Sequence, residues 1–312
     1  MISIVTAYFN RKKLFYNTLL RFQTSAIKDF EVIAVDDGSN EDNRLEDLMD
    51  EFSFLKVIRL DPEKKWYINS CIPFNVGFSA AKGDIIIIQN PECIHYGDIL
   101  QYVQQNLKPN DYLSFGAYSL DKITTDNINK KNAASFEELN IMFLPKAISQ
   151  DGESGWYNHS LYRPKGFHWC TALYKTDLDS LGGFDERFAL GVAFDDNELL
   201  ARIQKKGMNF KIINEPFVLH QNHFNIDIHT NKSINPFYTR KDAKLLWDKN
   251  EYIFNKLTLQ GKGWCVKKHS IFKIRLHDFL ITQRMQLKKR YEFFSWRIIN
   301  KLNRIYKIVT NK

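Results

Sequence analysis

A run of four isoleucines, residues 85–88, limits the possible folds of this chain more than any other feature. A glycine stands just before the run and a proline shortly after it, which leaves too few residues for a stable helix. An uninterrupted β-branched run is instead typical of a central strand covered on both faces, as in a parallel sheet. Ligands of open α/β sheets gather beyond the carboxyl ends of the strands. We therefore expect Asn90 and Glu92, just after this strand, at a ligand or metal site.

Strand and helix patterns alternate along the first part of the chain. The predicted strands cover residues 2–5, 30–35, 55–60 and 85–88. Apolar residues at helical spacing predict helices over residues 14–22 and 45–52, and a further helix leads into the isoleucine strand. This order predicts an α/β fold, a doubly wound and mostly parallel sheet flanked by helices. Residues 122–140 are polar and are predicted to form a loop.

Length and composition narrow the class of protein. With 312 residues, 44% of them hydrophobic, the chain can form one large domain, or a domain plus an extension. No apolar run approaches the ~20 residues of a membrane span. The four cysteines are far apart, and Met1 leads directly into a strand pattern rather than a signal peptide. We expect a cytoplasmic protein with reduced thiols and neither a disulfide nor a zinc site.

The basic character of the chain is concentrated in residues 265–312. They contain 13 Lys or Arg and two acids, so this segment carries +11 and the remainder about −3. From Leu287 onward, apolar residues recur at steps of three and four between basic residues, which predicts an amphipathic helix. Such a helix could bind an anionic membrane surface, which would make the protein peripheral to the membrane. It could equally pack on the core or associate with a second copy of itself. Because the rest of the chain is not basic, a nucleic-acid partner is not expected.

Two groups of motifs carry information about function. The first half of the chain contains ISIVTAYFNR, FEVIAVDDGSNED and NVGFSAAKGDIIII, and the second contains LGGFDERFALGVAFDDNELLARIQKKG and VLHQNH. In this order and spacing they resemble family-2 glycosyltransferases of the GT-A fold over roughly residues 1–225. The resemblance implies a catalytic domain with a nucleotide-sugar half, residues 1–105, and an acceptor half, residues 106–225. Residues 226–312 would then form a basic helical extension.

The resemblance implies an inverting enzyme that moves a sugar from a nucleotide donor, UDP-linked, to a hydroxyl of a glycan or lipid-linked acceptor. Hexosyl or N-acetylhexosaminyl transfer is the class that it suggests. Nucleotide contacts are expected from Thr6, Tyr8 and Asn75, and from either Asp36 or Asp37. From the residues alone, two acids and a glycine at the end of a strand form a turn by default, and the Asn75 segment could equally serve close packing.

In the family, the fourth strand ends in a D-x-D motif whose acids hold a metal on the diphosphate. That motif falls on residues 90–92, which read Asn-Pro-Glu in this chain. Asn90 and Glu92 can ligate Mg²⁺ or Mn²⁺, but with one charge fewer than two aspartates. We expect a divalent cation, weakly bound or dispensable, on Glu92, Asn90 and His220, with His223 as a further partner. Otherwise Asn90 is only a turn residue and His220 a structural one.

Residues 106–165 depart most from the family and are expected to carry acceptor specificity. Trp156, Arg163 and His168 belong to a cluster of aromatic and basic residues that could bind sugar rings and phosphate. An ordinary packing cluster is the alternative. By resemblance, Gly182 and Gly183 let the backbone pass close to the donor sugar.

Asp195 and Asp196 open the helix pattern of FDDNELLARIQKKG. The resemblance assigns Asp196 as the general base, with Asp195 in place of the usual glutamate. Adjacent carboxylates repel, which raises one pKa and helps a base to work near neutral pH. The alternative is a helix N-cap supported by Glu198. The altered D-x-D motif also leaves a second hypothesis open, a catalytically impaired protein that binds a glycan or a nucleotide sugar.

Overall fold

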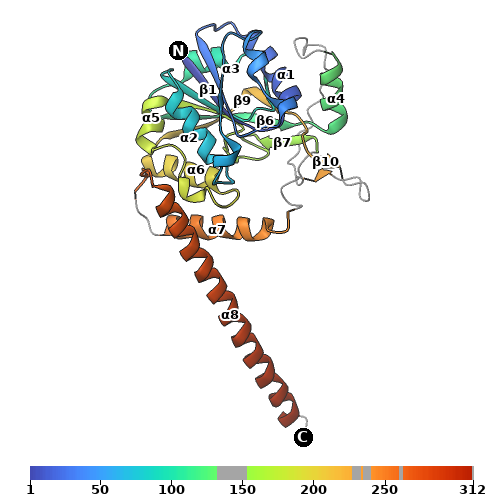
Figure 1. The fold of residues 1–312 in the computed structure, drawn as a ribbon, viewed down its shortest axis with the longest axis vertical. Helices are drawn as coiled ribbons and strands as arrows, with labels where there is room; N and C mark the ends of the chain where they lie inside the picture. The colour runs from blue at the N-terminus through green and yellow to red at the C-terminus, as the bar shows by residue number, and fades with distance from the viewer. Residues whose placement is uncertain (132–152, 227–232, 235–239, 260–262, 311–312) are drawn as a thin grey trace. The chain divides into compact units, whose positions relative to one another are not determined.

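The computed structural model describes residues 1–131, 153–226, 233–234, 240–259 and 263–310 (Figure 1). The chain divides into two compact units, Met1–Lys268 and His269–Lys312. Residues 226–268, which the family resemblance does not cover, therefore belong to the larger unit. No helix in the described part of the chain is both long and apolar enough to cross a membrane.

Nine strands of the larger unit form one sheet in the order β3-β2-β1-β4-β8-β6-β9-β5, with β7 paired to β6. Their bounds are β1 Ile2–Tyr8, β2 Phe30–Asp36, β3 Leu55–Arg59, β4 Ile85–Gln89, β5 Cys93–Tyr96, β6 Asp111–Ser119, β7 Gly155–Asn158, β8 Cys170–Tyr174 and β9 Asn209–His220. A separate antiparallel pair consists of β10 Asn225–Ile226 and β11 Ser233–Ile234.

The isoleucine run forms β4, at the middle of this sheet. β4 pairs in parallel with β1 and antiparallel with β8, so it joins a parallel half to an antiparallel one. Ile87 packs into the core on one face, whereas Ile86 and Ile88 pack into the core on the other. The predicted α/β fold with a strand covered on both faces is therefore confirmed, and the sheet is mixed because the acceptor half contributes antiparallel strands.

Helices cover both faces of the sheet (Figure 1). One face carries α1 Lys12–Gln23 and α3 Ile99–Asn106, and the other carries α2 Cys71–Ala80, α5 Lys175–Leu181 and α6 Asp195–Lys206. The apolar spacing seen in the sequence makes the contacts, since Phe15, Leu19 and Phe22 of α1 are all buried. The remaining helices are α4 Lys122–Lys131, α7 Ala243–Leu259 and α8 Ile271–Thr310, and short 3₁₀ turns are η1 Glu41–Asn43, η2 Glu46–Met49, η3 Pro62–Lys64 and η5 Glu186–Phe188.

Two local predictions differ from the structure. Within residues 45–52, only Glu46–Met49 are helical, and they form the 3₁₀ turn η2 rather than an α-helix, although Leu48 and Phe52 are buried as the spacing predicts. The segment just before them is held by tertiary contacts, because Asn43 accepts a hydrogen bond from the Tyr8 hydroxyl. Residues 122–131 are helical rather than a loop, because Asp121 caps the N-terminus of α4 by accepting from the backbone N–H of Thr124. The rest of that predicted loop, residues 132–140, lies outside the described residues.

Candidate active site

A cavity of about 1430 Å³ opens where the parallel strands β1, β2 and β4 end. Its wall includes residues that directly follow these strands. Of the predicted site residues, it contains Tyr8, Asp37, Asn90, Glu92, Arg163 and His220. The predicted residues outside the wall are Thr6, Asp36, Asn75, Trp156, His168, Gly182, Gly183, Asp195 and Asp196. The cavity thus brings the three metal candidates together with two of the nucleotide candidates, Tyr8 and Asp37, and the carboxylate pair of α6 is not part of its wall.

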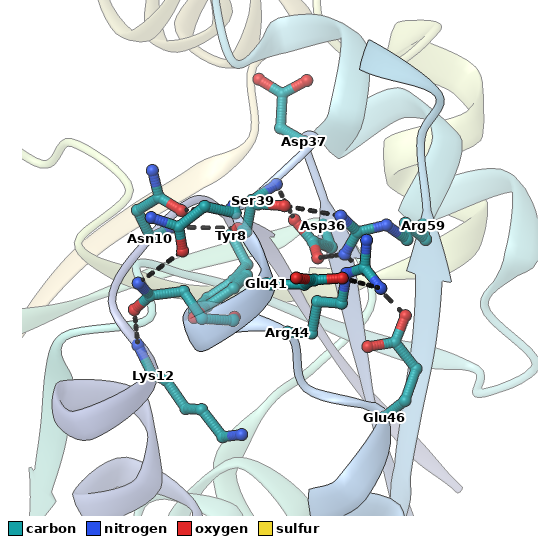
Figure 2. A network of polar contacts seen from close by, with 12 residues as sticks. Tyr8, Asn10, Lys12, Asp36, Asp37, Ser39, Glu41, Arg44, Glu46 and Arg59 are labelled. Carbon is teal, nitrogen blue, oxygen red and sulfur yellow. Dashed lines mark hydrogen bonds and ion pairs between the residues drawn. The ribbon is translucent and has the colours of Figure 1, made fainter.

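The two aspartates at the end of β2 have different positions. Asp36 is fully buried, where it pairs with Arg59 at 2.7 Å and accepts from the backbone N–H of Ser39. Figure 2 shows Asp36 directed at these partners and Asp37 directed away from them. Asp37 lines the cavity and accepts from the Tyr67 hydroxyl and from Lys65, each at 2.6 Å. Of the two alternatives, Asp37 is therefore the one that a ligand in the cavity can reach.

The two predicted contacts from β1 also separate. Tyr8 is in the cavity wall, but its hydroxyl is engaged within the protein, donating to Asn43 O at 2.7 Å and accepting from Arg11 N at 3.1 Å. Burial raises the pKa of Tyr8, so this phenol stays protonated. Thr6 is buried behind the wall, and its hydroxyl has no hydrogen-bond partner among the described residues.

Asn75 holds α2 against the turn that contains the two glycines. Its amide donates to Phe184 O and to Glu186 Oε1, and its carbonyl oxygen accepts from Phe184 N at 2.8 Å. Gly183 has a φ of +71°, and a Cβ there would lie 2.6 Å from Asn75 Oδ1. Gly182, at φ +86°, ends α5 against the backbone of Val266. Asn75, Gly182 and Gly183 therefore have structural roles, and the ligand contacts predicted for them stay predictions.

Glu92 is the centre of a cluster of polar side chains in the cavity wall. Its Oε1 lies 3.2 Å from His220 Nε2 and 3.4 Å from His223 Nε2, and its Oε2 lies 2.7 Å from Arg11 Nη1. The ligand atoms of Glu92, His220 and His223 lie within 4.8 Å of one another. β5 and β9 bring them together, because Cys93 pairs with His220 across the sheet. One carboxylate and two imidazoles at this spacing could hold a divalent cation.

The side chains around Glu92 keep it ionised. Burial would raise the pKa of Glu92, but Arg11, His223 and His220 together lower it well below its ordinary value. Burial lowers the pKa of His223 and outweighs the attraction of Glu92, so His223 is held in the neutral form that a metal requires. Arg11 is a functional candidate that the sequence reasoning missed. It directly follows ISIVTAYFN, and only the fold brings it to Glu92, 81 residues away.

Aromatic side chains extend the wall beside this cluster. Tyr157 stacks on Trp169 with ring centroids 5.5 Å apart and meets the edge of His220 at 5.0 Å. The Arg163 guanidinium lies over the Tyr157 ring at 5.6 Å. Trp156 faces elsewhere, since it packs in a buried cluster with Tyr118 and Phe217. The structure therefore separates Arg163, which faces the cavity, from Trp156, which belongs to the core.

Asp195 and Asp196 begin α6, and both have partners from distant segments. Asp195 is buried and its Oδ1 accepts from Asn69 Nδ2 at 3.0 Å. Asp196 is 31% exposed, and its Oδ1 contacts the Nδ1 atom of buried His168. His168 also meets the ring of Phe74, a residue of the cavity wall, at 5.1 Å between centroids. The sequence prediction of a sugar contact for His168 stays a prediction, and the observed contact makes it the partner of Asp196.

The electrostatics of this pair are those of neighbouring acids. Burial and the charge of Asp196 raise the pKa of Asp195. Burial opposes protonation of His168, but the two carboxylates outweigh it and raise the pKa of His168. The backbone just before the pair is unusual, because Ala193 and Phe194 have φ values of 58° and 65°. Non-glycine residues in this region carry strain that is often found at functional sites.

Helix α7 supports that strained segment. Asn250 Nδ2 donates to Ala193 O at 2.8 Å and to Phe188 O at 3.2 Å, and Lys249 donates to Leu190 O. Phe194 packs on Trp247 with ring centroids 5.1 Å apart. The sequence reasoning missed this role, because α7 lies beyond the residues that carry the family resemblance.

Comparisons with known proteins identify the family and several similar proteins. Residues 3–165 match the family described as glycosyl transferase family 2. Chondroitin synthase from Escherichia coli is 24% identical over 277 residues, which are 82% of this chain and 39% of that protein. The chain thus spans about two fifths of the length of this curated relative.

Solved structures of TarS from S. aureus are also similar. The 1–349 fragment is 14% identical, with a TM-score of 0.49 over 70% of this chain and 60% of that one. The same fragment in complex with UDP is 13% identical, with a TM-score of 0.48 over 70% and 59% of the two chains. The family match covers more than half of the present sequence, from β1 to just beyond β7. This chain belongs to glycosyl transferase family 2.

Proposed function

We propose that this protein is an inverting glycosyltransferase that moves a sugar from a UDP-sugar donor to a hydroxyl of a glycan or lipid-linked acceptor. The observation that carries the proposal is the convergence of Glu92, His220 and His223 in a cavity that also contains Asp37. This cavity lies at the carboxyl ends of parallel strands, where α/β sheets bind ligands. The part of the cavity near Asp37 can accept the nucleobase of the donor, and the part near Glu92 can accept its diphosphate with a cation.

The nucleotide end suits uracil. Asp37 is an acceptor-only group when ionised, and the imide N–H of uracil is a donor at the base edge. Tyr67 and Lys65 hold the Asp37 carboxylate in place. Phe9 is 49% exposed in the same wall and offers an aromatic face to a planar base.

The Glu92 cluster suits the diphosphate end. The residues fit a divalent cation, because they offer one carboxylate oxygen and two imidazole nitrogens within reach of one ion. Imidazole ligands favour Mn²⁺ over Mg²⁺, which prefers oxygen. A bound cation would neutralise the charge that develops on the departing diphosphate. Arg11 adds a fixed positive charge at the same place, so cation binding competes with an existing ion pair and is expected to be weak.

Asp196 is the proposed general base, which takes the proton of the acceptor hydroxyl in a single displacement. Its partial exposure leaves the carboxylate accessible, and contact with His168 fixes its direction. Asp195 remains behind it, bound to Asn69, and burial together with the charge of Asp196 raises the pKa of Asp195. Arg163, beside the Glu92 cluster, is proposed to contact the sugar or phosphate groups of the substrates.

The transferred group is proposed to be a hexosyl or N-acetylhexosaminyl unit. The likeness to a chondroitin synthase supports this class, although the chain spans only part of that relative. A second candidate is a binding protein that has lost catalysis. It is favoured by one observation, the Arg11 guanidinium on Glu92 Oε2, where a cation would otherwise approach.

A screen of sugar nucleotides tests the proposal. Thermal stabilisation of the protein reports binding, and release of the nucleoside diphosphate reports turnover, each with and without Mn²⁺. We expect a UDP-sugar to bind and to be consumed faster with Mn²⁺ and an acceptor present. Binding without turnover, across a panel of glycan and lipid-linked acceptors, would favour the second candidate. Absence of binding by every nucleotide sugar would contradict both.

A further inference from the structure

Helix α8 carries apolar side chains on two different faces. Ile274 and Ile281, two turns apart, are only 1% and 2% exposed. A second apolar row is 46% to 74% exposed and consists of Phe272, Leu276, Phe279, Leu280 and Leu287. With about 3.6 residues per turn, their spacing places these five on one face, away from the buried row. Exposed apolar residues gathered in this way mark an interaction surface.

Charge on α8 is arranged around this exposed row. The helix contains ten Lys or Arg and two acids, whereas the rest of the chain contains 34 of each kind, so the net charge of +8 resides in α8. Lys273, Arg275 and Arg284 are exposed and flank the apolar row on its two sides by helical spacing. Asp278 lies one turn from Ile274, on the other face. The exposed apolar row therefore has positive borders and no acid among its described members.

We propose that this face of α8 binds the surface of an anionic lipid bilayer, with the helix lying in the plane of the interface. Apolar side chains would enter the boundary of the acyl chains while the basic borders meet the lipid phosphates. A second copy of the helix is the less suitable occupant, because two such faces would bring positive borders together. Paired helices usually match opposite charges at these positions. Binding of this kind does not depend on glycosyl transfer.

Sedimentation of the full chain with lipid vesicles tests the proposal. We expect binding to vesicles of mixed phosphatidylcholine and phosphatidylglycerol, little binding to pure phosphatidylcholine, and weaker binding at high salt. Equal binding to both kinds of vesicle, or none to either, would overturn the proposal.

Two variants assign the binding to this face. Phe272→Glu with Phe279→Glu should weaken vesicle binding on the order of a hundredfold or more, since it removes apolar contact and adds repulsion. The matched control is Gln104→Glu with Gln105→Glu, which adds the same charge at exposed positions of α3 and should leave binding nearly unchanged. A loss in the control as large as in the α8 variant would mean that only net charge matters, and would overturn the assignment.

A second variant tests the basic borders. Lys273→Gln, Arg275→Gln and Arg284→Gln together should weaken binding to anionic vesicles by on the order of a hundredfold. Circular dichroism and thermal unfolding check that each variant is folded. If the apolar variant instead converts a dimer to a monomer in sedimentation velocity, and the parent protein does not bind vesicles, the partner is a second copy and the lipid proposal fails.

Discussion

Glu92 and Asp195 are both buried carboxylates, yet their surroundings act on them in opposite directions. Glu92 lies among Arg11, His220 and His223, and its pKa is lowered in spite of burial. Asp195 lies beside Asp196, and both burial and that neighbour raise its pKa. The surroundings of Glu92 therefore favour its negatively charged form, whereas those of Asp195 favour its protonated form. The comparison teaches that burial alone does not decide the protonation of an acid, because its neighbours can reverse the effect.

The largest effect is expected from Asp196. Asp196→Asn keeps the shape of the side chain and removes its basicity, so transfer to the acceptor should fall by ~10²- to 10⁴-fold. Donor binding should survive, because Glu92 and Asp37 are untouched. Steady-state kinetics with separate titration of the donor measures both. Asp195→Asn should cost less, mostly in acceptor affinity, and the reverse order would show that the roles within the pair are exchanged.

A smaller loss is expected from the other carboxylate. Glu92→Gln leaves Arg11 without its ion-pair partner and removes the one charged ligand of the candidate metal site. Loss of a residue that only hydrogen-bonds to a metal ligand typically lowers metal affinity by ~10- to 100-fold. Glu92 is a candidate direct ligand, so Mn²⁺ affinity should fall by at least this factor. Calorimetric titration with Mn²⁺ measures it directly, and Glu251→Gln, at an exposed position, is the matched control. Unchanged Mn²⁺ affinity and turnover would reduce Glu92 to a structural residue.

Asn250 tests whether the Asp195 site depends on distant support. Asn250→Ala removes hydrogen bonds to two carbonyl oxygens, those of Phe188 and Ala193, and should lower the free energy of unfolding by ~1–3 kcal/mol. Transfer should fall with it while Mn²⁺ affinity stays the same, because α7 contributes no residue to the described wall of the cavity that contains the Glu92 cluster. Asn255→Ala, on an exposed position of the same helix, controls for helix propensity. Equal unfolding free energies for the two variants would remove Asn250 from the support of this site.

The smallest effect is a difference in pH dependence. Glu92 has a lowered pKa in the folded protein, so its contribution to stability is present above its unfolded pKa of about 4.3 and is lost as the pH falls through the folded value. Asp195 has a raised pKa, so its contribution is present below about 3.9 and is lost as the pH rises through the folded value. Thermal unfolding of Glu92→Gln and Asp195→Asn, each measured beside the parent protein at several pH values, tests this difference.

At neutral pH, Glu92→Gln should therefore unfold at a lower temperature than the parent protein, and the gap should close in acid. Relative to the parent protein, Asp195→Asn should lose less stability at neutral pH than in acid. At neutral pH the parent carries an unfavourable negative charge on Asp195, which the variant lacks. The same sign of pH dependence for both variants would break the contrast between the two carboxylates.

The sequence by itself determined the parts of this protein that depend on local pattern. The isoleucine run predicts the central strand, because a β-branched apolar run without room for a helix has few other places in a fold. The alternation of strands and helices predicts that residues after β1, β2 and β4 meet at one edge. That edge is where Asp37 and Glu92 are found. The order and spacing of the motifs also predict the family, and the family match over residues 3–165 confirms this prediction.

Only the tertiary structure decided which of these residues act on one another. It turns Asp36 toward Arg59 and Asp37 toward the cavity, a choice that two adjacent aspartates do not reveal. It brings Arg11 to Glu92 across 81 positions, and Asn250 to Ala193 across 57. The physical reason is that hydrogen bonds and ion pairs depend on distances between atoms, and long-range strand pairing and helix packing set those distances. Sequence spacing limits them only within a single strand, helix or turn.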